Sequence, residues 1–538
     1  MHSSDSSKPS TPSGPDAGPS KVLAAEEMSH APASGELPVP EEVSAAGVID
    51  RPFRELLKIA APTVATMTSY TLMTFVDKLM SSRIGPDPIY VGAQGNGGLS
   101  SWVAISVFSG LLSIINTYVS QNLGAGRADR APAYAWNGLW IALGAFVLVM
   151  IPYGVALPSI YHAMRDTSLS PEQIARVVLR DQIATEYARV LIFFSLFTMA
   201  RLALAQYFYG MHRPMVVLVA CVAANLTNFV INSVLIYGPQ APAPVGNAAL
   251  DWWFAHAADL AKALGIPRLG VVGSGYGTVV ATLVELLILM GVFLSAKYQR
   301  LFKTRDHWRL SMQHVKDLLK LGWPAGLMFG NEMVCWGLFM VYFVGHFGTE
   351  HSTAGWIAHQ WMSLSFMPAV GISVAVTAMV GKCMGMKRPD LAAQRAWMGL
   401  RVAMVYMGIC GVCFVVFRRE LIGLFLDSTT PPDQAARLVA LGGKFLILTA
   451  IFQLFDAVAM ATSGALRGAG DTVFPGVVTV VASWVLIVGG GWATITYFPQ
   501  WESLGPWGAS SVYIITLSLF LLGRFLSGKW KHIKLVNG

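Results

Sequence analysis

Three acidic residues, Asp77, Glu332 and Asp456, stand within long apolar stretches of the sequence. An ionised side chain at the centre of a bilayer costs about 3 kcal/mol on insertion scales, so such a residue needs a partner or a function. Carboxylates at membrane depth typically belong to ion or proton pathways. We therefore predict that these three side chains bind a coupling cation or a proton.

Glu332 and Asp456 are predicted to act as a pair. Glu332 follows Pro324 by about 12 Å along a helix, and Asp456 lies between two apolar runs. If their helices are neighbours, the carboxylates can share one cation or one proton, because two anions held close together resist double ionisation. In a sodium-coupled protein this pair would be the Na⁺ site. The alternative is that each carboxyl group is hydrogen-bonded separately to Ser, Thr or the backbone.

Asp77 lies about 12 Å below the predicted outer end of its own apolar segment. Lys78 follows it directly, but adjacent residues of a helix point to different sides. Lys78 therefore need not neutralise Asp77, and its apolar stem can reach outward to the membrane surface. The alternative is a local ion pair that serves only membrane insertion.

Further polar residues are candidates for lining a cavity between helices. They are Asn225, Asn228, Asn232, Gln453, Arg201 and Glu285. The three asparagines are spaced i, i+3, i+7 and share one helix face, which suits either a cavity lining or hydrogen bonds between helices. Arg201 and Glu285 either line a pore or form a buried pair between their two helices.

The composition of the chain indicates that membrane helices position these residues. Of 538 residues, 54% are hydrophobic and only 13% are charged, against about 25% charged in soluble domains. The mean hydropathy is +0.53. These values exclude a soluble enzyme, a disordered scaffold and a secreted disulfide framework, and they predict a multi-pass membrane protein in contact with the lipid bilayer.

Twelve apolar segments have the length that a tilted membrane-spanning helix needs. They cover residues 55–80, 96–122, 132–157, 183–209, 215–237, 273–295, 318–345, 357–384, 392–417, 440–464, 473–497 and 506–527. The connection 238–271 alternates aromatic and charged residues, so it is either a short interfacial helix or an irregular tether.

The loop charges predict the orientation of these segments. The formal net charge is +8, and Lys and Arg gather in alternate loops, for example Lys382, Lys387 and Arg388. This bias is typical of cytoplasmic loops, so both termini are expected in the cytoplasm and the protein in the inner membrane. The bias also explains the positive net charge, so nucleic acid is not expected as a partner.

The N-terminal stretch differs from the rest of the chain. Residues 1–50 hold two basic and eight acidic residues and no apolar core, which predicts a disordered cytoplasmic tail and no cleavable signal peptide.

The chain also repeats itself. Leu56-Leu57-Lys58 with Pro62 recurs as Leu318-Leu319-Lys320 with Pro324, at an offset of 262. The loop ending at Arg127 recurs at Arg388, and Gly210 recurs as Gly468, at offsets of 261 and 258. We therefore predict two parallel six-helix bundles, 51–296 and 318–538, joined by a cytoplasmic linker, 297–317. Secondary transporters use this arrangement, with the substrate path between the halves.

Other chemistries lack their motifs in this sequence. There is no phosphate-binding loop of the Walker type and no Ser-His-Asp or zinc-protease pattern, so neither direct ATP-driven transport nor an enzyme is expected, and no cofactor is expected. The five cysteines, among them Cys410 and Cys413, are expected to be buried thiols rather than a metal or redox site.

Several motifs resemble the multidrug and toxic compound extrusion (MATE) family, in particular its norfloxacin-exporter branch. They are Phe75-Val76-Asp77-x-x-Met80, Gln121-x-x-Gly124-Ala125-Gly126-Arg127, His359-Gln360, Asp456-Ala457-Val458 and Gly464-Ala465-Leu466-Arg467-Gly468-x-Gly470-Asp471-Thr472. The resemblance covers residues 51 to 530. It implies twelve spans in two six-helix bundles around a V-shaped cavity, and export of organic cations and other amphipathic compounds in exchange for Na⁺ or H⁺.

The resemblance also implies roles for single residues. Asp77 matches the family's first-helix carboxylate, and Glu332 and Asp456 match the carboxylates of helices 7 and 10. Lys78 departs from the pattern, because a small or hydroxyl residue is usual there, and the fifth span has Asn where some members have Asp.

The expected protein is a monomeric antiporter that works by alternating access. The alternatives are a lipid-linked oligosaccharide flippase of the same superfamily and, from another class, a membrane-embedded transferase. The coupling ion, the natural substrate and the stoichiometry stay open at this point.

Overall fold

The computed structural model describes residues 52–85, 89–164, 171–425 and 431–535. The predicted tail, 1–50, lies outside the described residues. Every regular element within the described residues is helical, and none is a strand. Lipid offers no hydrogen-bonding groups to the backbone, and a helix satisfies its backbone hydrogen bonds internally. The predicted all-α membrane fold is therefore confirmed.

Within the described residues, eleven helical segments are long and apolar enough to cross a membrane, counting one bent pair as a single segment. That pair is α7 (Pro171–Phe193) and α8 (Ser195–Gly210), which meet at 50°. The other ten are α3–α4 (Ile89–Leu112, Ile114–Gly124), α5–η2–α6 (Ala131–Ala145, Phe146–Met150, Ile151–Ala163), α9 (Pro214–Leu235), α11 (Gly270–Phe293), α13–η3–η4 (Met312–Leu338, Phe339–Val344, Gly345–Phe347), α14 (Thr349–Gly385), α15 (Pro389–Val416), α17 (Pro432–Ala469), α18–η5–α19 (Val473–Ala482, Ser483–Gly489, Gly490–Tyr497) and α20 (Leu504–Leu526).

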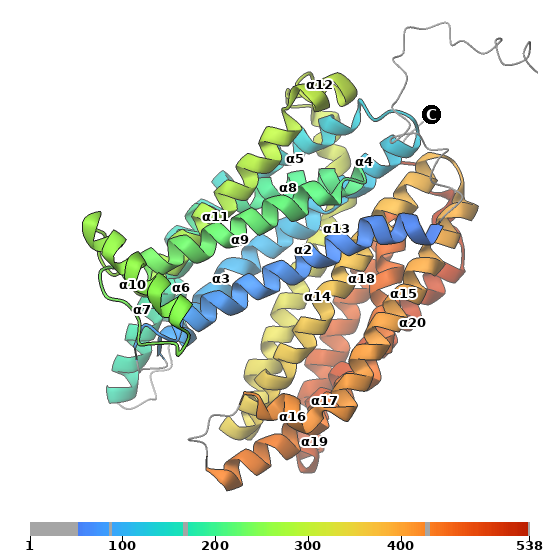
Figure 1. The fold of residues 1–538 in the computed structure, drawn as a ribbon. Coiled ribbons are helices and arrows are strands. Elements are labelled where there is room, and N and C mark those ends of the chain that lie inside the picture. Colours follow the sequence, from blue (N-terminus) through green and yellow to red (C-terminus); the bar gives the residue numbers. More distant parts are fainter. Residues whose placement is uncertain (1–51, 86–88, 165–170, 426–430, 536–538) are drawn as a thin grey trace, which may run out of the picture. The chain divides into compact units, whose positions relative to one another are not determined.

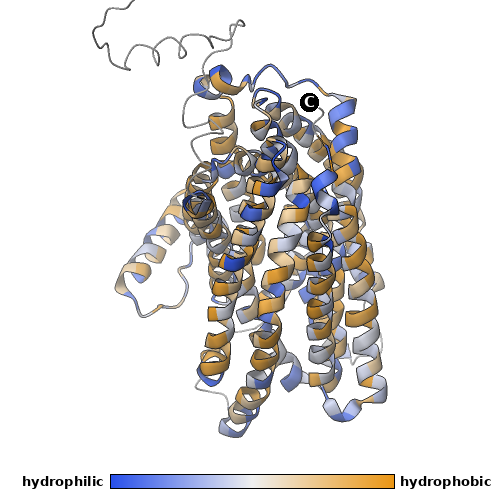
Figure 2. Ribbon diagram, turned by 90° about the vertical axis from the view of Figure 1, so that its right-hand side faces the viewer, coloured by the Kyte–Doolittle hydropathy of each residue, from blue (hydrophilic) through white to orange (hydrophobic). Residues whose placement is uncertain are grey.

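The first predicted segment is α2 (Pro52–Ser81), which is not in that apolar set. Threonines lower its hydropathy, but their hydroxyl groups are satisfied within the helix. Thr63 donates to the carbonyl of Ile59 at 2.7 Å, and Thr66 donates to that of Pro62 at 2.8 Å. With α2, each of the twelve predicted apolar segments corresponds to a helical segment of the structure. Figure 2 shows hydrophobic residues along most of the helices and hydrophilic residues gathered toward their ends.

Short helices occupy several connections. In the connection 238–271, α10 (Ala248–Ala263) is capped by Asn247, whose side chain accepts hydrogen bonds from two backbone N–H groups of the first turn. Its Phe254 is buried, whereas Trp252 is exposed on the opposite face. The prediction of a short helix is correct, and the irregular tether is wrong. The other short elements are α12 (Ala296–Phe302), α16 (Arg418–Gly423), η6 (Pro499–Trp501) and η7 (Lys529–His532).

The backbone repeats itself in the two halves, as the sequence predicts. Gly126 and Lys387, 261 residues apart, both have a positive φ, of 73° and 58°. His212 and Gly470, 258 residues apart, do so as well, with φ of 58° and 93°. A positive φ is uncommon for a residue other than glycine, so its recurrence at matching positions shows that the two copies make the same turns.

Two of the close helix crossings that join the halves are related by the repeat. Helix α3 packs against α13, and α2 packs against α14, which lies beside it in Figure 1. A Cβ on Gly110 of α3 would overlap the carbonyl of Ala325, and a Cβ on Gly371 of α14 would lie 2.8 Å from the Cα of Val64. Gly110 and Gly371 are 261 residues apart, which matches the repeat offset. Small residues at such crossings let membrane helices approach closely.

Ion pairs close the end of the molecule at which α2 begins. The carboxylate of Glu55 lies 3.5 Å from the Lys382 ammonium and 3.2 Å from the Arg395 guanidinium. All three side chains are buried. Lys382, which the sequence places among the orienting loop charges, and Arg395 therefore tie the second half to the first.

Candidate functional site

The second half holds two of the predicted carboxylates in one region. Glu332 lies on α13 and Asp456 on α17, and the two carboxyl groups are close enough to interact electrostatically. The hydroxyl of Tyr513 on α20 donates a hydrogen bond to Glu332 Oε1 at 3.3 Å. Glu332 also interacts electrostatically with Arg467, but no ion pair within 4 Å joins them in the described part of the chain.

Asp456 is the less compensated of the two acids. Only 5% of its surface is exposed. Among the residues that the structure describes, no side chain or backbone group forms a hydrogen bond or an ion pair with it. Buried carboxylates usually have such partners, because desolvation is costly without them. The Glu332–Asp456 pair is therefore a place where a cation or a proton would be stabilised.

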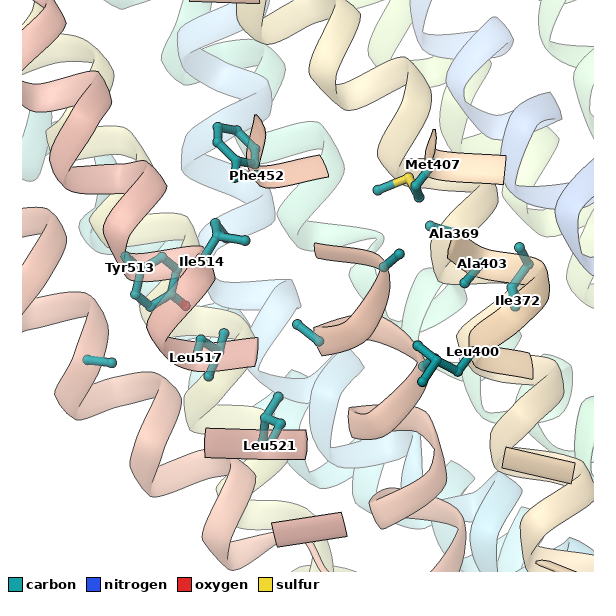
Figure 3. Close-up of a cluster of buried hydrophobic side chains, with 14 of the residues drawn as sticks. Ala369, Ile372, Leu400, Ala403, Met407, Phe452, Tyr513, Ile514, Leu517 and Leu521 are labelled. Atoms are coloured by element: carbon teal, nitrogen blue, oxygen red, sulfur yellow. The ribbon is translucent and has the colours of Figure 1, made fainter. Parts of the chain in front are cut away.

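Apolar packing fixes the helices that carry this pair. Phe452 lies one turn before Asp456 on α17 and is buried in the same core as Tyr513 of α20. Figure 3 shows both side chains within that core, together with Ile514 and Leu517 of α20. The hydroxyl of Tyr513 is thus presented to Glu332 by a close-packed helix. Gln453, a predicted cavity-lining residue, instead donates a hydrogen bond to Ser365 Oγ at 2.5 Å within this half.

Asp77 lies in the first half and is hydrogen-bonded. Asn232 Nδ2 on α9 donates to Asp77 Oδ1 at 2.7 Å, and Thr278 Oγ1 on α11 is 3.5 Å from Oδ2. Asn232 also donates to Asn228 Oδ1, at 3.1 Å. Helices α2, α9 and α11 thus meet at this carboxylate, which accepts neutral donors and has no ion pair among the described residues.

The predicted asparagine stripe on α9 faces α2. In addition to the contacts of Asn228 and Asn232, Asn225 Nδ2 donates to the carbonyl and the hydroxyl of Ser69, at 2.9 and 2.6 Å. The sequence leaves open whether these asparagines line a cavity or form hydrogen bonds between helices, and the structure shows the hydrogen bonds.

Lys78 does not neutralise Asp77. Its side chain is exposed whereas Asp77 is buried, and no ion pair joins the two. Lys78 interacts electrostatically with His359 of α14 instead. The two neighbours therefore point to different sides of α2, as the helical geometry predicts.

Arg201 and Glu285 form a buried pair between α8 and α11, which was one of the two sequence alternatives. Arg201 Nη1 lies 3.2 Å from Glu285 Oε1, and these residues are 9% and 2% exposed. The hydroxyl of Tyr70 on α2 donates to the same Oε1 at 2.5 Å and accepts a hydrogen bond from Arg201 at 2.6 Å. The sequence reasoning missed Tyr70 and Tyr513. The repeat could have indicated Tyr70, because it stands 262 residues before Glu332.

No cluster of three or more His, Cys, Asp or Glu that could hold a metal ion occurs among the described residues. A transported cation at Glu332 and Asp456 would thus have two carboxylates and the Tyr513 hydroxyl as side-chain oxygen ligands. Hard monovalent and divalent cations prefer oxygen ligands of this kind.

Comparison with known proteins identifies the family. The MatE family model matches residues 62–234 and again 324–492, which is more than half of the chain and places the two matches 262 residues apart. The chain is 26% identical over 492 residues to a probable multidrug resistance protein NorM of Pseudomonas syringae pv. tomato, covering 90% of this chain and 97% of that protein. It is 27% identical over 480 residues to a probable multidrug resistance protein NorM of Mesorhizobium japonicum, with coverages of 88% and 93%.

A solved structure has the same fold. The outward-facing conformation of a multidrug resistance MATE family transporter of the MOP superfamily matches with a TM-score of 0.74 at 19% identity, covering 90% of this chain and 97% of that one. At this identity the likeness shows the fold alone. Together with the repeated family match, it shows that this chain belongs to the MATE family, in its NorM-like branch, and is a multi-pass membrane transporter rather than an enzyme.

Proposed function

We propose that this transporter exports organic cations and other amphipathic drugs in exchange for Na⁺ or H⁺, with Glu332 and Asp456 as the coupling site. The observation that carries this proposal is the buried Asp456, which lacks a hydrogen bond or an ion pair in the described structure and lies beside a second carboxylate. A cation or proton bound there offsets the repulsion between the two acids. The names of the NorM relatives support drugs as the exported compounds.

Coupling needs a difference in ion affinity between two conformations, because a ligand with equal affinity for both shifts nothing. In this structure the end of the molecule at Glu55 is closed by ion pairs between the halves. We propose that the ion binds the carboxylate pair in this state and leaves after the halves have rearranged. Asp77 provides a second binding event, because its carboxylate joins three helices of the first half.

We also propose a monomer in the inner membrane, with both termini in the cytoplasm. The loop charges support this orientation, since Lys and Arg accumulate in cytoplasmic loops. No cofactor is required in this scheme, because the ion gradient supplies the energy.

The substitution Asp456→Asn tests the coupling site. The purified full-length protein is reconstituted in liposomes, and ethidium efflux is driven by an Na⁺ gradient and by a pH gradient in separate experiments. We expect Asp456→Asn to reduce the gradient-driven flux by about tenfold or more with whichever ion drives the wild type, because the neutral amide removes the differential ion affinity.

The control is Asp259→Asn, which removes an exposed carboxylate from α10. It should retain the wild-type flux with both gradients. Normal ethidium efflux by a well-folded Asp456→Asn protein would remove the coupling role from this pair.

A further inference from the structure

Each half contains a contact between a tyrosine hydroxyl and a glutamate on its first and sixth helices, with the two residue types on opposite helices. In the first half the Tyr70 hydroxyl on α2 contacts Glu285 on α11, and in the second half the Tyr513 hydroxyl on α20 contacts Glu332 on α13. Tyr70 and Glu332 are 262 residues apart, the same offset that separates the two family matches. Each half therefore places one carboxylate between its first and its sixth helix.

The fourth helix of each half contributes a charge of opposite sign to this place. In the first half it is the guanidinium of Arg201, 3.2 Å from Glu285, and in the second half it is Asp456. By the offset of 258, Asp456 matches Thr198, which is about one helical turn from Arg201. The Arg201–Glu285 pair has no net charge when both partners are ionised. Glu332 and Asp456 then carry two negative charges, with Arg467 only at longer electrostatic range.

We propose that Glu285 is a second cation site of this transporter whose ion has been replaced by the guanidinium of Arg201. This inference rests on the proposed coupling function of Glu332 and Asp456. A guanidinium stays charged in proteins and is covalently attached, so it neutralises Glu285 in every conformation and never exchanges. Of the two tyrosine–glutamate sites, only the one in the second half can then bind and release an ion.

The surroundings of Glu285 fit a site of this kind. The polar atoms within reach are the Tyr70 hydroxyl, the Arg201 guanidinium and, at longer electrostatic range, Tyr209 of α8 and Cys221 of α9. Arg201 is thus the cation among them. The carboxylate is almost fully buried, and removing one partner of a buried ion pair leaves an uncompensated charge. A small cation or a proton can take the place of the lost guanidinium.

The substitution Arg201→Gln tests the inference, with Arg201→Gln/Glu285→Gln as its matched control. The number of coupling ions per ethidium is measured in proteoliposomes from the driving force at which the ethidium flux reverses. We expect this ratio to rise by one ion in Arg201→Gln and to return to the wild-type value in the double variant. Arg201→Lys, which keeps a tethered cation, should retain the wild-type ratio.

A second measurement covers the case in which Arg201→Gln is too unstable for transport. Its melting temperature should rise by about 5 °C or more with high Na⁺ or low pH, because a ligand that binds only the folded state stabilises it. The wild type and the double variant retain only the Glu332–Asp456 site, so their melting temperatures should rise less than that of Arg201→Gln. Either of two results would overturn the proposal and leave the Arg201–Glu285 pair as a structural contact. One is a wild-type ion ratio in Arg201→Gln, and the other is an Arg201→Gln melting temperature that responds to Na⁺ and pH as that of the double variant does.

These outcomes are separable from a failure of the proposed coupling site. Retained ion-driven export by Asp456→Asn would contradict the role of the second half. The melting comparison between Arg201→Gln and Arg201→Gln/Glu285→Gln would still decide whether Glu285 binds an ion.

Discussion

Four carboxylates on the predicted membrane-spanning segments differ in what neutralises them. Glu285 has a guanidinium, Asp77 has neutral amide and hydroxyl donors, and Glu332 has a tyrosine hydroxyl. Asp456 has no hydrogen-bond or ion-pair partner in the described part of the chain. The degree of compensation therefore ranks these residues as candidates for ion exchange, since the least compensated acid gains the most from a bound cation.

At the scale of single residues, Asn232 is expected to hold Asp77 in place. Asn232→Leu removes the 2.7 Å hydrogen bond to Asp77, so the unfolding free energy should fall by about 1–3 kcal/mol, the cost of a buried group that loses its hydrogen bond. Denaturant or thermal unfolding of the purified protein measures this.

The control is Thr227→Val on the same helix, because the Thr227 hydroxyl bonds only to the Ala223 carbonyl within α9. Its effect should stay within about 0.5 kcal/mol. Equal losses in both variants would show that Asn232 acts through general packing and not through Asp77.

At the scale of helices, the structure depends on two crossings that have no room for side chains. Gly110 on α3 faces the backbone of α13, and Gly371 on α14 faces that of α2. Membrane helices associate mainly through such close packing, because lipid is as apolar as the helix surface. The two crossings hold the first helix of each half against the second helix of the other half.

Gly110→Val should therefore separate α3 from α13. We expect a loss of about 1–3 kcal/mol of stability or more, typical of overpacked cores, together with a loss of ethidium transport. Thermal melting and proteoliposome efflux measure the two effects. Gly95→Val is the control on the same helix, since a Cβ at Gly95 meets nothing within 4 Å. The close-packing account fails if the two valine variants behave alike.

At the scale of the whole transporter, the ion pairs of Glu55 close one end of the molecule. Lys382 and Arg395 come from the second half, and Glu55 comes from the first. Breaking a buried ion pair costs about 3–5 kcal/mol because a charge is left unpaired. Since this contact joins the halves, its loss should destabilise the closed state more than the fold of either half.

Glu55→Gln is therefore expected to favour opening at this end. The thiol of Cys383 is buried beside Lys382, so its maleimide labelling reports the opening. In a variant with Cys383 as its single cysteine, Glu55→Gln should raise the labelling rate by about tenfold, which corresponds to about 1.4 kcal/mol.

Asp390→Asn removes an exposed ion pair with Arg388 from the same end of the molecule and serves as the control. It should change the labelling rate little, because exposed ion pairs contribute about 0–1 kcal/mol. An unchanged rate in Glu55→Gln would show that other contacts keep this end closed.

The sequence by itself determined the helices, their number and the two-fold repeat. Apolar segments of membrane-spanning length leave the backbone no alternative to helix, because lipid offers no hydrogen bonds. The matching turns at Arg127 and Arg388 could be read from glycine and arginine positions alone. Helix ends were predicted less well: α17 begins at Pro432 rather than near residue 440, because a helix continues beyond the apolar stretch that identifies it.

Only the tertiary structure decided which charge meets which partner. Asp77, Glu285 and Asp456 look alike in the sequence, as acids in apolar runs. Helix packing brings Asn232 to the first and Arg201 to the second across 155 and 84 residues of chain, and it brings the third close to Glu332. Hydropathy fixes that a side chain lies at membrane depth, but the rotation and crossing of the helices fix its neighbours. The charge of a buried site is a property of those neighbours.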